Sequence, residues 1–232
     1  MRLDKYLCDT LNMTRTEAKK AISKGRVAVD GCVAKSGSLQ VGDQSVFLDG
    51  QPVVYQRYFY VMLHKPKGYV CANRDSRSKT VFDLLPSEYQ KKDLFVCGRL
   101  DKDTTGLVLI TNNGELAHRL LAPKKEIFKE YLVTLRDPVT AYDIEMLKHG
   151  IDLRDGLHCR PAYFDQYGEC YGLLRISEGK FHQIKRMFAT LGNEVIELHR
   201  RAIHGLSLDP TLEIGECRYL TEEEIISLEN VQ

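Results

Sequence analysis

The segment richest in side chains that could do chemistry is GRLDKDTTG, at positions 98–106. It lies between two apolar segments and holds two carboxylates, Asp101 and Asp103, with Arg99 and Lys102 as neighbours. Loops at the ends of strands often carry catalytic or binding residues, because the strands hold them in place. A solvated turn, in which Asp and Thr side chains bond to nearby backbone amides, would have the same composition.

Two kinds of chemistry fit this loop considered alone. DKDTTG is similar to the DxDxT pattern of phosphotransferases that use an aspartate nucleophile with Mg²⁺. Alternatively, Asp101 and Asp103 could form an acid/base pair, as in glycoside hydrolysis. Both hypotheses require further carboxylates outside the loop, and the sequence shows none in a comparable setting.

A third interpretation accounts for more of the chain. GRLDKDTTGLVLITNNGELAHRL (98–120) resembles the signature of the pseudouridine synthases, in the branch that modifies ribosomal RNA. Three other segments match the same family in the same order: LHKPKGYVCA (63–72), KEYLVTL (129–135) and EGKFHQIKRMFATLGNEVIELHR (178–200). The resemblance covers about residues 60–226 and implies that Asp101, the aspartate after Arg-Leu, is the essential catalyst.

The resemblance also implies a substrate. Similarity over the whole length, including the LTEEEI tail, points to the small-subunit branch and to uridine 516 of 16S ribosomal RNA, free or in a partly assembled small ribosomal subunit. A large-subunit enzyme and a noncatalytic RNA-binding assembly factor are the alternatives.

The isomerisation explains why such residues are needed. It breaks the bond from N1 to C1′, rotates the uracil and rejoins it through C5 without a redox change, so we expect no cofactor and no metal. Asp101 must be ionised, and a nearby cation favours that state. Ile184, Phe188 and Leu191 define the buried face of a helix, so Lys185 can lie at its edge near Asp101. The family places a basic partner of the aspartate at this position.

Reaching a glycosidic bond within folded RNA requires flipping the nucleotide, and a flipped base needs an aromatic face. Alternation in KEYLVTL makes Tyr131 a core residue by default, whereas the resemblance makes it the base-stacking residue. We expect Arg99 to fill the space that the base leaves or to hold a phosphate, and His182 to orient the start of its helix. Further candidates for contacts with the RNA backbone are Lys65, Lys67, Lys180, Arg186, Arg200 and Arg201.

The first 50 residues carry a separate pattern. Leucines at positions 3, 7 and 11 predict a short helix, and Thr14 with Glu17 forms a capping box for a second helix that ends at Gly25. Asp-Gly pairs at 30–31 and 49–50 predict two hairpins. The segment resembles the S4 RNA-binding domain, which implies phosphate contacts by Arg2, Lys5, Arg15, Lys19 and Arg26.

The remaining elements predict an α+β catalytic domain with a mainly antiparallel sheet. The expected division is an S4 domain with its linker over 1–56 and a catalytic domain over 57–232. Strands are predicted over 60–63, 95–97, 107–111, 131–135 and 171–176. Helices are predicted over 115–121, 141–149 and 182–191.

Composition limits the protein class. The chain has 232 residues, of which 43% are hydrophobic and 28% charged, which excludes fibrous and disordered classes. It shows neither an apolar run of about 20 residues nor a signal-peptide core, so we expect a cytoplasmic protein with no membrane partner. The sequence leaves the oligomeric state open, with a monomer as the default. Seven cysteines without a CxxC pair predict free thiols. The net charge is +1, but basic residues predominate near the N-terminus and acidic residues near the C-terminus.

Overall fold

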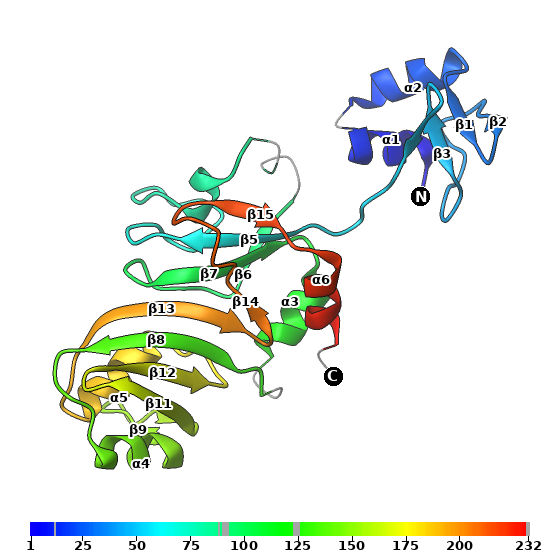
Figure 1. The fold of residues 1–232 in the computed structure, drawn as a ribbon. Helices are drawn as coiled ribbons and strands as arrows, with labels where there is room; N and C mark the ends of the chain where they lie inside the picture. The colour runs from blue at the N-terminus through cyan, green and yellow to red at the C-terminus, as the bar shows by residue number, and fades with distance from the viewer. Residues whose placement is uncertain (12, 88, 90–92, 123–125, 231–232) are drawn as a thin grey trace. The chain divides into compact units, whose positions relative to one another are not determined.

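The structure is a computed structural model that describes residues 1–11, 13–87, 89, 93–122 and 126–230. The chain forms two compact units, Met1–Arg57 and Tyr58–Gln232 (Figure 1). The boundary between them lies one residue after the one expected from the sequence. Each unit is described by itself.

The small unit packs two helices against a four-stranded sheet with the order β2-β1-β3-β4. Thr14 caps the second helix through the predicted capping box with Glu17. Apolar side chains from both helices and from the strands form one core, which includes Leu3, Leu7 and Ile22. Its elements are α1 (Leu3–Leu11), α2 (Arg15–Ser23), β1 (Val27–Val29), β2 (Cys32–Val33), β3 (Val46–Leu48) and β4 (Gln51–Val53).

The two hairpins turn at the predicted Asp-Gly pairs. Asp30 and Gly31 have φ values of 48° and 79°, and Asp49 and Gly50 have values of 51° and 78°. Two successive positive φ angles are typical of the type I′ turn, whose twist matches that of the flanking strands. The register of both hairpins is therefore fixed by local sequence.

The large unit is built on a nine-stranded sheet with the order β11-β12-β8-β13-β7-β5-β15, while β14 pairs with β13 and β6 with β7. Its first elements are β5 (Tyr60–Lys65), the 3-10 helix η1 (Val81–Leu84), β6 (Phe95–Cys97), β7 (Thr105–Thr111), α3 (Gly114–Leu121), β8 (Lys129–Leu135) and α4 (Ala141–His149). The others are β9 (Ile151–Asp152), β10 (His158–Cys159), β11 (Ala162–Gly168), β12 (Tyr171–Ile176), α5 (Gln183–Thr190), β13 (Val195–Ile203), β14 (Leu206–Ser207), β15 (Cys217–Tyr219) and α6 (Glu222–Glu229).

The sheet separates two hydrophobic cores. Alternation along β5 sends Val61 and Leu63 into one core and Tyr60 and Met62 into the other. Helices α4 and α5 contact the β11 and β13 part of the unit, whereas α3 and α6 contact β6 and β14 (Figure 1). The predicted α+β class is confirmed, and most strand pairs are antiparallel.

The seam between β7 and β13 is the exception, because these strands pair in parallel at Thr105 with His199 and at Gly106 with Arg200. Gly106 has a φ of 106°, and a Cβ atom there would lie 2.3 Å from the backbone oxygen of Arg200. Only glycine allows so close an approach. The seam joins the β5–β7 part of the sheet to the β13–β8 part.

No helix in the described ranges has both the length and the apolar character needed to cross a membrane.

Candidate active site

Asp101 lies in the connection from β6 to β7, beside the start of β7. Its backbone oxygen accepts a hydrogen bond from Thr104 N at 3.1 Å, and its side chain is 27% exposed. The carboxylate lines a pocket together with Arg99, Leu100, Tyr131, His182 and Lys185. The structure thus gathers the three predicted catalytic side chains, from three different elements, in one place.

Lys65 lies beneath this loop, and the expectation that it contacts RNA is wrong. The residue is 0% exposed. Its Nζ donates to four carbonyl oxygens, those of Pro66 at 3.0 Å, Asp101 at 3.1 Å, Lys102 at 3.3 Å and Thr104 at 2.7 Å. Burial lowers the pKa of Lys65. This lysine positions the loop from inside, because buried carbonyls need a donor.

Lys185 connects the two carboxylates of the loop. Its Nζ lies 3.7 Å from Asp101 Oδ2 and donates a hydrogen bond to Asp103 Oδ1 at 2.5 Å. Burial opposes ionisation of Asp103, but the hydrogen bond and the charge of Lys185 outweigh it and hold the pKa of Asp103 below its usual value. The sequence analysis predicted a contact of Lys185 with Asp101 only, and it missed the closer contact with Asp103.

His182 is a second residue close to the Asp101 carboxylate, a contact that the sequence analysis did not assign. Its Nε2 lies 3.6 Å from Asp101 Oδ1. The residue precedes α5 with a left-handed φ of 46°, and its side chain makes no capping hydrogen bond. The expectation that His182 orients the start of the helix is therefore wrong for its side chain, which is turned to the pocket. No pattern in the sequence predicts the left-handed backbone conformation of His182.

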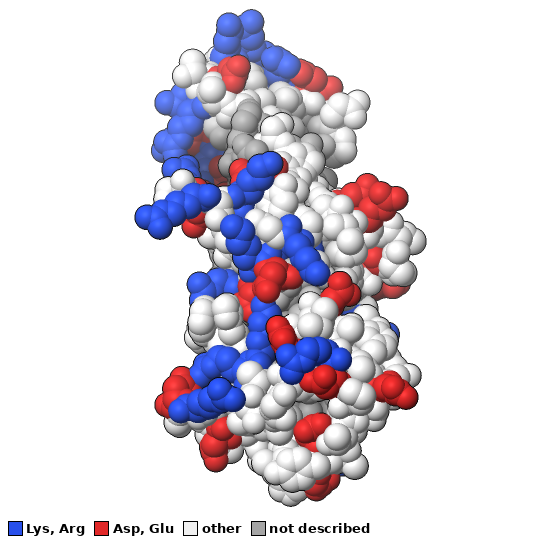
Figure 2. Space-filling view, turned by 90° about the vertical axis from the view of Figure 1, so that its left-hand side faces the viewer, with Lys and Arg blue, Asp and Glu red and all other residues white. Residues whose placement is uncertain are grey.

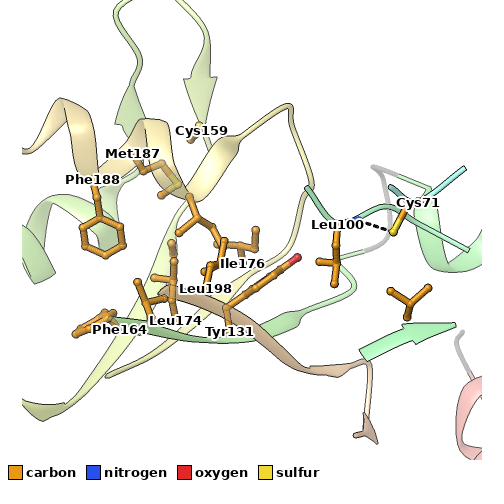
Figure 3. Close-up of a cluster of buried hydrophobic side chains, with 14 of the residues drawn as sticks. Cys71, Leu100, Tyr131, Cys159, Phe164, Leu174, Ile176, Met187, Phe188 and Leu198 are labelled. Carbon is orange, nitrogen blue, oxygen red and sulfur yellow. Dashed lines mark hydrogen bonds between the residues drawn. The ribbon is translucent and has the colours of Figure 1, made fainter. Parts of the chain in front are cut away.

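Tyr131 closes the apolar side of the pocket. Its side chain is buried in β8, and its ring lies near Ile176, Leu198 and Leu100, with the hydroxyl directed toward Leu100 (Figure 3). Within the described part of the chain, the hydroxyl makes no hydrogen bond. The backbone N–H of Leu100 donates a hydrogen bond to Cys71 Sγ at 3.3 Å.

This arrangement offers an aspartate with the Lys185 ammonium group and the His182 ring near its carboxylate and the Tyr131 ring in the same pocket. The ammonium group of Lys185 gives the Asp101 carboxylate a positive partner, which suits a nucleophile or an electrostatic catalyst. The pocket itself holds about 60 Å³. Binding sites for small molecules usually have about 300 Å³ or more, so the lining side chains must move apart to admit a nucleoside.

The predicted RNA-contacting residues of the large unit fall into different settings. Arg99 is exposed at the pocket. Arg186 is 28% exposed and pairs with Asp155 at 2.5 Å. Arg200 is only 2% exposed and donates to the Leu107 oxygen at 2.8 Å, so its predicted RNA contact is wrong. Of the other candidates, Lys67 is exposed and pairs with Glu197, Lys180 pairs with Glu178, and Arg201 is exposed.

The basic residues of the small unit lie at its surface. Arg2, Lys5 and Arg26 are paired with the carboxylates of Asp4, Asp9 and Asp49 respectively. Among the residues that the structure describes, Arg15 and Lys19 make no ion pair or side-chain hydrogen bond, and both are exposed. One turn of α2 separates them, so both lie on one face of the helix.

A space-filling view shows lysine and arginine side chains spread over the face of the large unit that is turned to the left in Figure 1 (Figure 2). The loop before β7 lies on that side of the large unit, because β7 runs from left to right in Figure 1. Acidic side chains lie among the basic ones. Positive charge of this kind fits a phosphate backbone, which a protein binds largely through Lys and Arg.

Comparison with known proteins agrees with this geometry. Residues 59–190 match the family model described as RNA pseudouridylate synthase, and residues 1–52 match that of the S4 domain. The chain is 47% identical to ribosomal small subunit pseudouridine synthase A of Vibrio cholerae, over 98% of this chain and 99% of that protein. It is 42% identical to the protein of that name in Escherichia coli, over 98% of this chain and 100% of that protein.

Two further matches span nearly the whole chain. An uncharacterized RNA pseudouridine synthase of Bacillus subtilis, YtzG, is 42% identical over 100% of both chains. A crystal structure of a pseudouridylate synthase superposes with a TM-score of 0.71 at 40% identity and covers 98% of this chain and 99% of its own. These similarities overturn the phosphotransferase and glycoside hydrolase hypotheses for the DKDTTG loop. The chain belongs to the RNA pseudouridine synthase family and carries an S4 domain at its N-terminus.

Proposed function

We propose that the protein converts one uridine of small-subunit ribosomal RNA to pseudouridine, with Asp101 as the catalytic residue. The observation that carries this proposal is the position of Asp101, whose carboxylate lies 3.7 Å from Lys185 Nζ in a pocket that Tyr131 also lines. An ionised carboxylate between a cation and an aromatic face is what the reaction needs.

The chemistry is an isomerisation. The bond from N1 to C1′ breaks, the bond from C5 to C1′ forms, the hydrogen on C5 leaves as a proton and N1 gains a proton. Asp101 takes part by attacking C1′, by attacking C6 or by assisting glycal formation, and each route uses the same carboxylate. Tyr131 stacks on the flipped uracil, Lys185 pairs with the Asp101 carboxylate, and Arg99 fills the space that the base leaves.

The substrate proposal rests on the relatives and on the small unit. Relatives at 42–47% identity are named for the small ribosomal subunit, and the S4 domain adds a second RNA-binding surface. We assign 16S ribosomal RNA as substrate, free or in a partly assembled small subunit, with uridine 516 as target. RNA sites are recognised by shape and unpaired bases, so both units contribute to selection. The protein acts as a cytoplasmic monomer.

Mapping pseudouridine across ribosomal RNA tests the proposal. Cells lacking this protein should lose one pseudouridine of the small-subunit RNA, and wild type should restore it while Asp101→Asn should not. Loss of a large-subunit pseudouridine instead would overturn the substrate. Restoration by Asp101→Asn would overturn the role of Asp101.

The same cells distinguish a noncatalytic assembly factor. Such a factor would leave every pseudouridine in place, and its assembly defect would be rescued by Asp101→Asn. The purified protein would then release no tritium from RNA labelled at C5 of uridine, whereas an active enzyme releases it with each turnover.

A further inference from the structure

Phe181 is an exposed aromatic residue beside the catalytic pocket that the mechanism does not use. Its side chain is 72% exposed. The ring stacks on that of His182, with centroids 3.9 Å apart and planes at 16°. His182 in turn reaches within 3.6 Å of Asp101, so the two rings form a platform, Phe181–His182, that extends from the carboxylate to the surface.

The backbone at this platform is unusual. His182 has a φ of 46°, in the left-handed region that residues with a side chain rarely adopt. Strained positions of this kind are concentrated at active sites and ligand clamps. Since the side chain of His182 does not cap α5, no helix-capping bond explains the conformation. A function for the stacked rings would explain it.

Phe181 also lines an apolar groove that is distinct from the catalytic pocket. It has a volume of about 420 Å³ and is lined by Phe181, Leu153, Ala189, Arg154 and Arg186 among others. A nucleobase fits a groove of this size. The two arginines give its rim a positive charge, although Asp155 pairs with Arg186. Arg154 donates to the Ala189 oxygen at 3.3 Å and is otherwise exposed.

We propose that the Phe181–His182 platform and this groove bind the base of a nucleotide next to the target uridine in the same RNA strand. This inference rests on the proposed function. When a uridine is flipped, its neighbour loses a stacking partner on one side, and an exposed aromatic ring replaces that partner whatever the base. His182 lines the catalytic pocket and stacks on Phe181, which lines the groove, and the two arginines of the groove suit the flanking phosphate.

Phe181→Ala tests the platform in steady-state assays on the RNA substrate. Stacking on one aromatic ring accounts for about a fivefold to 150-fold effect, so we expect kcat/KM to fall about tenfold or more. Phe181→Tyr keeps a flat ring and should stay within about threefold of wild type. Tyr142→Ala removes an aromatic residue of similar exposure, 68%, from α4 and should leave the rate unchanged. Equal rates for Phe181→Ala and wild type would overturn the proposal.

An abasic substitution separates stacking from a general effect on the fold. Removing the base before or after the target should lower the rate of wild type. The decrease should equal the one that Phe181→Ala causes on intact RNA. The same substitution should not slow Phe181→Ala further, because the contact is already absent. If both abasic RNAs slow wild type and Phe181→Ala equally, the platform does not bind the neighbour. Wild type and Asp101→Asn are compared on the same intact small-subunit RNA, and a wild type without activity there would overturn the proposed function rather than the platform.

Discussion

The two units of the protein use positive charge in opposite ways. In the small unit, Arg15 and Lys19 lie exposed on one face of α2. In the large unit, Lys65 is completely buried and holds the carbonyl oxygens of the catalytic loop, and Lys185 connects Asp101 with Asp103. Arg15 and Lys19 of the small unit are thus open to solvent, whereas Lys65 and Lys185 of the large unit contact groups of their own unit.

This difference teaches that basic residues counted along a sequence do not measure an RNA-binding surface. Lys65 and Arg200 were both expected to touch RNA, yet both are buried and donate to backbone oxygens. A buried cation fixes geometry, and an exposed one contributes long-range attraction. Substitutions in the two units should therefore change different measurements.

Asp101→Asn should have the largest effect. The amide keeps the size of the side chain but cannot act as a nucleophile or carry charge, so we expect a loss of activity of about 10⁴-fold or more. RNA affinity, measured by filter binding, should change less than about threefold because the small unit is untouched. A parallel loss of affinity would mean that the units are not separable in this way.

Lys65→Met should have the next largest effect, and on stability. Removing the donor leaves buried carbonyl groups unsatisfied, which costs about 3 kcal/mol of unfolding free energy. Urea denaturation measures the change, and activity should fall with it because the loop loses its support. Lys102→Met is the matched control in the same loop: Lys102 is exposed, so this change should stay within about 0.5 kcal/mol. Equal stability of the two variants would refute the internal role of Lys65.

Arg15→Gln combined with Lys19→Gln should weaken RNA binding about tenfold and leave the single-turnover rate at saturating enzyme unchanged. Each lost phosphate contact reduces the slope of log affinity against log salt by about 0.7 to 0.9, so the slope should decrease by about 1.5. Lys20→Gln combined with Lys24→Gln removes the same charge nearby. If that control pair weakens binding equally, the small unit attracts RNA only through its total charge.

Lys129→Met should have the smallest effect and the opposite sign to Lys65→Met. Lys129 is buried and donates to a single carbonyl oxygen, that of Ile127 at 3.0 Å. Burial lowers its pKa from 10.5 to about 8. Replacing a buried charge that has so few partners with an apolar side chain should raise the unfolding free energy at pH 7 by about 1 kcal/mol.

The pH dependence of the unfolding free energy tests this prediction for Lys129. Between about pH 8 and pH 10.5 the unfolded chain still holds the proton that the folded chain has lost, so stability contributed by this group rises with pH in that window. The gain from Lys129→Met should therefore shrink as the pH rises from 7 to 9, as measured by urea denaturation of both proteins. A constant difference would show that Lys129 does not titrate there.

The sequence correctly predicted the features that depend only on residues a few positions apart. The Thr14 capping box and the Asp-Gly turns appear where expected, because a cap or a turn needs only residues within a few positions. Strands β11 and β13 were not predicted. Strand β13 contains charged residues, including Arg200, whose burial depends on its partner strands. Its parallel pairing with β7 joins segments about ninety residues apart, which no local pattern reveals.

The sequence predicted which residues line the pocket better than it predicted the contacts that they make. Asp101, Tyr131 and Lys185 came from motifs and lie around one pocket. Lysine is almost never fully buried, so the position of Lys65 at the end of an apolar strand was read as exposed. The left-handed backbone of His182 and the contact between Lys185 and Asp103 depend on tertiary packing, so neither could be foreseen.

The close approach at Gly106 has a consequence for how this enzyme can be altered. Asp101 precedes β7, whereas Tyr131 and Lys185 lie on the far side of the seam from it, on β8 and α5. A backbone contact that admits no side chain therefore lies between Asp101 and the two residues across the seam. Engineers can change which groups line the pocket, but enlarging residue 106 would push β7 and β13 apart and separate Asp101 from Tyr131 and Lys185.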